Sequence, residues 1–151
     1  MSKNNMKTVI TGGAGFIGSH AVDKLLDRGF RVRVIDDLSG GRIDNVQHLN
    51  GTDAFEFIEM DVCRLPDESV IFSDADLVLH FAGVGDIVPS VEDPVKYMHT
   101  NLMGTVRVLE SARSARVRRF VYAASSSCYG ASPDVPTDEN APIVAEYPYA
   151  L

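Results

Sequence analysis

Three glycines near the amino terminus have the spacing of a turn that binds phosphate. Gly12, Gly15 and Gly18 follow a short run with β-branched residues at its centre, Lys7–Thr11. From Phe16 onward the apolar residues recur at helical spacing. Glycine has no side chain to hold a ligand away from the backbone, and the start of a helix presents free N–H groups and a positive dipole end. The pattern predicts a pyrophosphate site, and the alternative is a turn required only for tight packing.

An acidic pair ends the second apolar run, Arg31–Asp36. Asp36 lies 18 residues after Gly18 and is followed at once by Asp37. A carboxylate at this place can accept hydrogen bonds from both hydroxyls of a dinucleotide ribose. The extra 2′-phosphate of NADP would instead meet two carboxylates with no arginine adjacent. The sequence therefore favours NAD over NADP.

Polar residues also follow the later apolar runs. Asp61 is either a contact for the adenine edge or a solvated strand end. Ser125, Ser126 and Ser127 are either a solvated loop or hydroxyl donors that meet a substrate beside the nicotinamide. His80 has no second His, Cys or Glu at ligand spacing, so we expect a hydrogen-bonded core histidine and no metal site.

Five strands alternating with helices must position these residues. The apolar runs predict strands at residues 7–11, 31–36, 54–61, 76–82 and 118–124. A helix begins at Asp93-Pro94 and continues for about five turns, and Gly104 inside it indicates close approach to the sheet. Residues 125–148 are expected to be a loop. This alternation predicts an α/β fold with a doubly wound parallel sheet, a Rossmann fold of order 3-2-1-4-5, whose ligand crevice lies at the carboxyl ends of the strands.

The composition is that of a globular chain and excludes two classes of partner. The 151 residues carry a net charge of −7 without a basic stripe, which argues against nucleic acid and anionic membranes as main partners. No apolar run approaches the roughly 20 residues that span a bilayer. Cys63 and Cys128 form no paired motif, so a reducing cytoplasm is expected. We expect residues 1–5 to be a disordered tail and residues 6–151 to form one NAD-binding domain.

Together these residues resemble the extended short-chain dehydrogenase/reductase superfamily and, within it, the nucleotide-sugar epimerase/dehydratase family. The resembling stretches are residues 11–18, 34–41, 80–83, 101–112, 121–130 and 147–151. The resemblance implies NAD bound along the sheet. It implies cofactor contacts at Gly12, Gly15, Phe16, Ile17, Gly18, Asp36, Asp37, Leu38, Ser39, Gly40, Gly41, Asp61, Val62, Phe81, Ala82, Gly83, Val84, Gly85, Asn101 and Tyr149.

The resemblance also implies a catalytic apparatus. Ser125 and Tyr149 match the family's catalytic hydroxyls, and Ser127 is a third candidate. Tyr149 would take a proton from a sugar hydroxyl while Ser125 hydrogen-bonds the same oxygen. The family's lysine would fall at position 153, beyond Leu151. The chain is therefore expected to be an N-terminal fragment that lacks the lysine and the substrate domain and has no turnover of its own.

The residues before Tyr129 favour one reaction of the family. Its dehydratases and decarboxylases carry acids where this chain has Ser126 and Ser127. The expected reaction is thus epimerisation at C4 of a UDP-sugar, UDP-glucose/galactose or a UDP-N-acetylhexosamine, through a transient 4-keto intermediate. The alternatives are a 4,6-dehydratase or decarboxylase of the same family and a non-catalytic NAD-binding fragment. Because family members often pair through their long helices, here residues 93–114, a homodimer is expected of the full-length protein.

Overall fold

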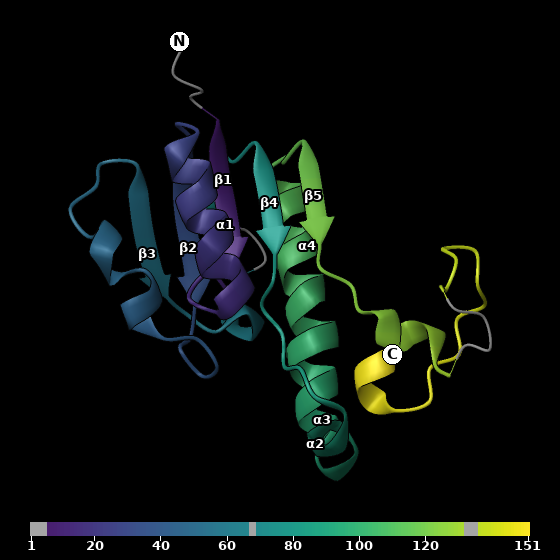
Figure 1. The fold of residues 1–151 in the computed structure, drawn as a ribbon. Coiled ribbons are helices and arrows are strands. Elements are labelled where there is room, and N and C mark those ends of the chain that lie inside the picture. Colours follow the sequence, from purple (N-terminus) through teal and green to yellow (C-terminus); the bar gives the residue numbers. More distant parts are fainter. Residues whose placement is uncertain (1–5, 67–68, 132–135) are drawn as a thin grey trace.

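Five parallel strands form one sheet in the order β3-β2-β1-β4-β5 (Figure 1). The computed structural model describes residues 6–66, 69–131 and 136–151, so the tail expected at residues 1–5 lies outside the described residues. The predicted order is confirmed, and so are the bounds of the first two strands. The strands are β1 Lys7–Thr11, β2 Arg31–Asp36, β3 Phe55–Glu59, β4 Leu77–His80 and β5 Arg119–Tyr122. The last three are shorter than predicted because the chain leaves the sheet ladder to form loops at their ends.

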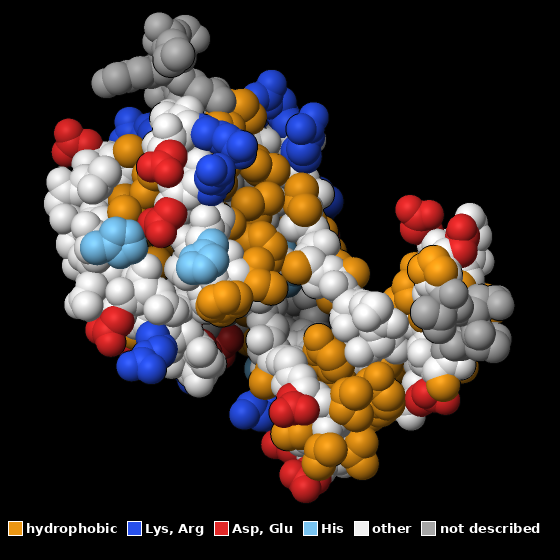
Figure 2. Space-filling view, viewed as in Figure 1, with side chains coloured by type: hydrophobic (Ala, Val, Ile, Leu, Met, Phe, Trp, Pro, Cys, Tyr) orange, Lys and Arg blue, Asp and Glu red, His pale blue; other side chains and the backbone are white. Residues whose placement is uncertain are grey.

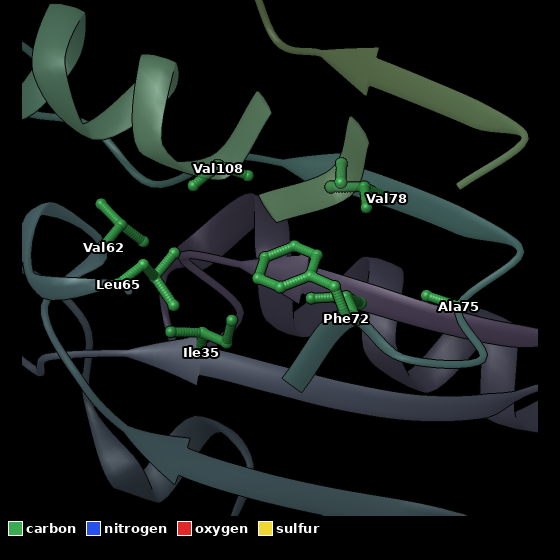
Figure 3. Close-up of a cluster of buried hydrophobic side chains, with 9 residues drawn as sticks. Ile35, Val62, Leu65, Phe72, Ala75, Val78 and Val108 are labelled. Atoms are coloured by element: carbon green, nitrogen blue, oxygen red, sulfur yellow. The ribbon is translucent and has the colours of Figure 1, made fainter. Parts of the chain in front are cut away.

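Helices cover both faces of the sheet. Helix α1, Phe16–Asp27, lies on one face, where Val22 packs with Ile10 and Val34. Helix α4, Gly104–Ser114, lies on the other, where its Val108 joins a cluster around the fully buried ring of Phe72 (Figure 3). The central strand β1 is buried along nearly its whole length, as expected for a strand covered on both faces, whereas the edge strand β5 is mostly exposed. The sheet therefore supports the polar residues that lie at the ends of its strands.

The predicted long helix is present but is not a single α-helix. It begins as expected, with Pro94 in its first turn and the carboxylate of Asp93 accepting the Lys96 N–H at 3.1 Å. Helix α3, Pro94–Tyr97, then passes into a π-helical turn, Met98–Met103, before α4. A short helix before it, α2 Ile87–Glu92, was not predicted. None of the described helices is long and apolar enough to cross a membrane.

Gly104 is required by close packing, but not against a strand. A Cβ at this position would lie 3.0 Å from Val62 Cγ2 and 3.3 Å from Cys63 Sγ. Both neighbours belong to the 3₁₀ turn η3, Val62–Arg64, which follows β3. The helix does make a close approach at Gly104, but the expectation that it approaches the sheet there was wrong, because the neighbour is the turn η3.

Short 3₁₀ turns also form in segments that connect or follow the strands. Two such turns lie between β2 and β3, Ile43–Asn45 and Gln47–Leu49. The segment expected to be a loop after β5 begins with η6, Ser126–Tyr129, and the chain ends with η7, Pro148–Ala150.

Candidate cofactor and catalytic site

The glycine turn after β1 leaves no room for side chains. Gly12 has a φ of +70°, in the left-handed region, and its N–H donates to the Ile35 carbonyl at 2.8 Å. A Cβ on Gly18 would lie 2.1 Å from the Gly12 oxygen. The helix then begins at Phe16, whose first-turn amides have no intrahelical partner. This closed glycine cradle with exposed amides fits a pyrophosphate.

Asp36 connects the end of β2 with this turn. Asp36 is 6% exposed as a residue, and its carboxylate Oδ2 accepts the Ala14 N–H and its Oδ1 accepts the Leu38 N–H, both at 2.9 Å. An ionised carboxylate has about four acceptor positions, so each oxygen can accept one further hydrogen bond. Asp36 therefore both holds the loop in place and retains acceptor capacity for ribose hydroxyls.

The loop after Asp36 folds back over the glycine turn. Asp37 is exposed, and its Oδ1 accepts the Ser39 N–H at 2.9 Å and the Ser39 hydroxyl at 2.6 Å. A Cβ on Gly41 would lie 2.8 Å from an oxygen of Asp36, and Arg42 N–H donates to the Ala14 carbonyl at 3.0 Å. Gly40 has open space around it. Asp36 and Gly41, the two ends of the segment predicted at 36–41, thus lie against the glycine turn at Ala14.

Asp61 serves as the cap of the turn that follows β3. Its Oδ1 accepts the Cys63 N–H at 2.9 Å, which gives the side chain a structural role whether or not it also meets a ligand. Val62 is 5% exposed and packs in the core, so only its backbone is available to a ligand. Burial, followed by the charge of Asp61, raises the pKa of the Cys63 thiol to about 11. The thiol is therefore protonated and unreactive at neutral pH.

Residues 81–85 are held from the helix side by two side chains. The Asn101 amide donates to the Val84 carbonyl at 3.0 Å and accepts the Val84 N–H at 2.8 Å. The Tyr97 hydroxyl donates to the Gly85 carbonyl at 2.6 Å. Asn101 was expected to face the cofactor, and its amide is engaged with the backbone of this segment. Tyr97 was missed, although its place four residues before Asn101 puts both on one helical face.

The two hydroxyl-bearing segments near the carboxyl terminus lie together. The turn η6, which follows Ser125, contacts η7, which contains Tyr149 (Figure 1). Ser125 Oγ accepts the Ser127 N–H at 3.2 Å, so its own proton is available for donation. The Tyr149 ring packs edge-on against Tyr97, with ring centroids 6.3 Å apart. Tyr97 thereby links Tyr149 to residues 81–85. Figure 2 shows the surface hollowed between the sheet and this carboxyl-terminal region.

His80 is a hydrogen-bonded core histidine, as predicted. It is 1% exposed at the end of β4, and its two ring nitrogens lie within hydrogen-bond distance of the hydroxyls of Thr11 and Thr105. Burial lowers its pKa to about 4, so the ring is neutral at physiological pH.

Acid is expected to destabilise the fold through His80. Its folded-state pKa of about 4 lies below the ordinary value of 6.5, so between these values the unfolded chain binds a proton that the folded chain does not. The free energy of unfolding is therefore highest above pH 6.5 and falls as the pH drops, by about 2 kcal/mol at pH 5 from this group. Urea unfolding at pH 7 and pH 5 measures the fall, and His80→Gln should flatten it by that amount. An equal fall in both proteins would contradict the assignment.

A pocket lined by Lys7, Arg31, Phe55 and Ser73 lies at the amino-terminal ends of the strands, the edge opposite to the glycine turn. Within residues 6–66, 69–131 and 136–151, no three His, Cys, Asp or Glu side chains are grouped so as to hold a metal ion.

Comparison with known proteins places these features in a family. The NAD dependent epimerase/dehydratase family matches residues 8–151. The UDP-glucose 4-epimerase of Mycolicibacterium smegmatis is 40% identical over 147 residues, which are 96% of this chain and 47% of that protein. Among solved structures, the UDP-N-acetylglucosamine 4-epimerase from Methanobrevibacter ruminantium M1, in complex with UDP-N-acetylmuramic acid, matches with a TM-score of 0.91 and 32% identity over 97% of this chain and 46% of that one.

A relative with another activity is similarly close in structure. The dTDP-glucose 4,6-dehydratase from Streptomyces venezuelae, solved with NAD bound, matches with a TM-score of 0.89 and 29% identity over 96% of this chain and 47% of that one. The chain thus spans about half the length of each of these three proteins.

Proposed function

Because the chain belongs to the NAD dependent epimerase/dehydratase family, we propose that the complete protein binds NAD and interconverts the C4 epimers of a UDP-sugar. Residues 6–151 form its NAD-binding domain. The remainder of the protein supplies the substrate domain and the lysine that the resemblance to the family implies after Tyr149. The observation that carries the proposal is the connection of Tyr149 through Tyr97 to residues 81–85. This connection brings a phenol beside the segment expected to lie along the cofactor.

The residues that would hold NAD follow from the cradle. The amides after Gly15 meet the pyrophosphate, and Asp36 accepts from the ribose through its remaining lone pairs. Asp61 and Val62 lie at the adenine, and residues 81–85 lie along the cofactor. The neighbouring acid Asp37 disfavours a 2′-phosphate, which makes NAD the preferred dinucleotide. NAD, when bound, supplies the acceptance and return of a hydride.

The protein's own contribution is to position and deprotonate the sugar. Tyr149 removes the proton from the C4 hydroxyl while the Ser125 hydroxyl donates a hydrogen bond to the same oxygen and keeps its own proton. If the C4 hydride also leaves to bound NAD, a 4-keto sugar would form, and it would turn over and take the hydride back on its other face, with no net oxidation. Ser127 holds Ser125 through its N–H at 3.2 Å and is the third hydroxyl of the site.

Elimination is the second candidate reaction, because a dehydratase is among the structural relatives. Ser126 and Ser127 replace the acids that dehydratases of the family are expected to carry before Tyr129. Without such an acid, loss of water from the sugar lacks its proton shuttle, and epimerisation is favoured.

The direct test uses the complete protein with UDP-glucose, UDP-galactose and the two UDP-N-acetylhexosamines. We expect interconversion of one C4 pair without consumption of added NAD. Release of a 4-keto-6-deoxy sugar would support the dehydratase instead, and NAD binding without any turnover would support the non-catalytic module. The 151-residue chain on its own should bind NAD without turnover, since it spans only about half the length of the related epimerases.

Homodimer formation and a cytoplasmic location complete the proposal. Apolar side chains of the long helix are exposed, namely Leu102, Val106 and Leu109, and a second copy of the protein would cover them. Cys63 and Cys128 are both free thiols, as in a reducing compartment.

A further inference from the structure

His80 lies at the centre of a row of hydrogen bonds that is buried at Thr11 and half-buried at Thr105. Its Nδ1 is 2.5 Å from Thr11 Oγ1, and its Nε2 is 2.9 Å from Thr105 Oγ1. Thr11 ends β1 and Thr105 is the second residue of α4, so the ring bridges the sheet and the helix that covers it. The rings of Phe120 and Tyr122 lie beside it, with centroids 5.9 and 5.7 Å away. The groups that face His80 are thus two hydroxyls and two aromatic rings.

One arrangement of protons satisfies every atom of this row. The Thr105 hydroxyl lies 2.5 Å from the carbonyl oxygen of Asn101, which can only accept, so the hydroxyl proton points there. Thr105 Oγ1 must then accept from Nε2–H of His80, which leaves Nδ1 bare to accept the hydroxyl proton of Thr11. The oxygen of Thr11 in turn accepts the Ala82 N–H at 3.3 Å. His80 is therefore the neutral Nε2–H tautomer, and the protons run in one direction from Ala82 to Asn101.

The row ends where two parts of the candidate site touch. Ala82 is the second residue of the segment 81–85. A Cβ on Gly12 would lie 2.6 Å from the Ala82 nitrogen and 2.7 Å from the carbonyl carbon of Phe81. The glycine turn and this segment are thus in direct backbone contact, and a shift of the Ala82 amide changes the gap between them.

We propose that Thr11, His80 and Thr105 are positioning residues that set the spacing between the glycine turn and residues 81–85, and thereby the affinity for NAD. The inference rests on the proposed function, because residues 81–85 meet the cofactor only if NAD lies along the sheet. Thr11 and His80 are 0% and 1% exposed, so they act on the cofactor through the Ala82 amide, and the half-buried Thr105 acts through its hydrogen bond with His80.

Removing single hydroxyls at constant shape tests the row. In Thr11→Val and Thr105→Val, NADH bound to the 151-residue chain should have a dissociation constant about tenfold higher, as measured by its fluorescence, because a buried group loses its partner. Thr11→Ser and Thr105→Ser keep the hydroxyl and should restore the affinity to within about twofold.

Thr8 provides a matched control in the same strand. Its Oγ1 is buried and has no hydrogen-bond partner in the described part of the chain. Thr8→Val is therefore the same chemical change outside the row. It should leave the NADH affinity unchanged and should not lower the melting temperature.

The direction of the protons has a readout that needs no cofactor. Long-range ¹⁵N–¹H spectra of His80 should show a protonated Nε2 and a bare Nδ1 from about pH 5 to 8. An Nδ1–H tautomer, or a mixture of the two, would overturn the assigned order.

The outcomes separate this inference from the proposed function. A wild-type chain that does not bind NADH overturns the proposed function and the spacing role with it, whereas the tautomer spectra still decide the proton order. Unchanged NADH binding in both valine variants, or no recovery in the serine variants, overturns the positioning role alone. Loss in the valine variants, recovery with serine and no effect of Thr8→Val support it.

Discussion

Tyr149→Phe is expected to lower kcat of the complete protein by about 10²–10⁴-fold, the range that a positioned acid or base contributes. The change removes only the phenolic oxygen that takes the sugar proton. The ring keeps its edge contact with Tyr97, so η7 should remain in place and NAD affinity should change far less than kcat. Rates of UDP-hexose interconversion at saturating substrate, with a parallel NADH titration, measure the two effects separately.

Tyr147→Phe is the matched control for this prediction. Tyr147 lies two residues earlier, at the cap of the same turn, and is partly buried like Tyr149. Since no chemical role is proposed for its hydroxyl, kcat should be nearly unchanged. A Tyr149→Phe protein that kept more than about a tenth of the wild-type kcat would be inconsistent with Tyr149 as the base.

Gly18→Ala should abolish NAD binding and destabilise the chain by about 3 kcal/mol or more. The new Cβ would lie 2.1 Å from the Gly12 oxygen and 2.8 Å from the Gly13 Cα. Both are backbone atoms, so no rotamer change can relieve the contact, and the turn itself must move. Urea unfolding and NADH fluorescence titration of the 151-residue chain measure the two losses.

Gly51→Ala separates the clash from the ordinary cost of replacing a glycine. Gly51 has a φ of +84°, but a Cβ there would meet no atom within 4 Å. Its replacement should cost about 1–2 kcal/mol from backbone strain alone and leave NADH affinity unchanged. If Gly18→Ala behaved like this control, the closed glycine cradle would not be what binds the pyrophosphate.

The parts of the fold that depend on local patterns were predictable. The bounds of β1 and β2 follow from β-branched runs that end at a glycine turn and at an acidic pair. The helix start at Asp93 follows from a cap and a proline, which act within four residues. Strand order followed as well, because alternating strands and helices with right-handed crossovers allow few arrangements.

Departures from regular geometry were not predictable in the same way. The apolar spacing around Met98 predicts a continuous α-helix, whereas the structure forms the π-helical turn Met98–Met103 there. Gly104 indicated that something packs closely against the helix but not which residues do so, since Val62 and Cys63 come from a turn some 40 residues earlier in the chain. Such contacts depend on how whole elements pack, which residue spacing does not encode.

In the candidate site, too, features that depend on local sequence were predictable and contacts between distant residues were not. Glycines, acids and hydroxyls at strand ends indicated where ligands would meet the sheet. The contacts that hold those residues could not be predicted from the sequence. Asp61 caps a turn, Asn101 hydrogen-bonds the backbone of Val84, and Tyr97 contacts both Gly85 and Tyr149. Each role needed the position of a partner that lies elsewhere in the chain or in a turn that was not foreseen.

The sequence by itself determined the sheet order, the glycine turn and the type of ligand that such a turn accepts. These follow from backbone conformations available to a few neighbouring residues and from the carboxylate that ends β2. Only the tertiary structure decided how the turn is kept at its distance from residues 81–85. That spacing depends on Thr11 and His80, which are 69 residues apart in the chain and 2.5 Å apart in the fold, and the proton order between them is defined only when both partners are in place.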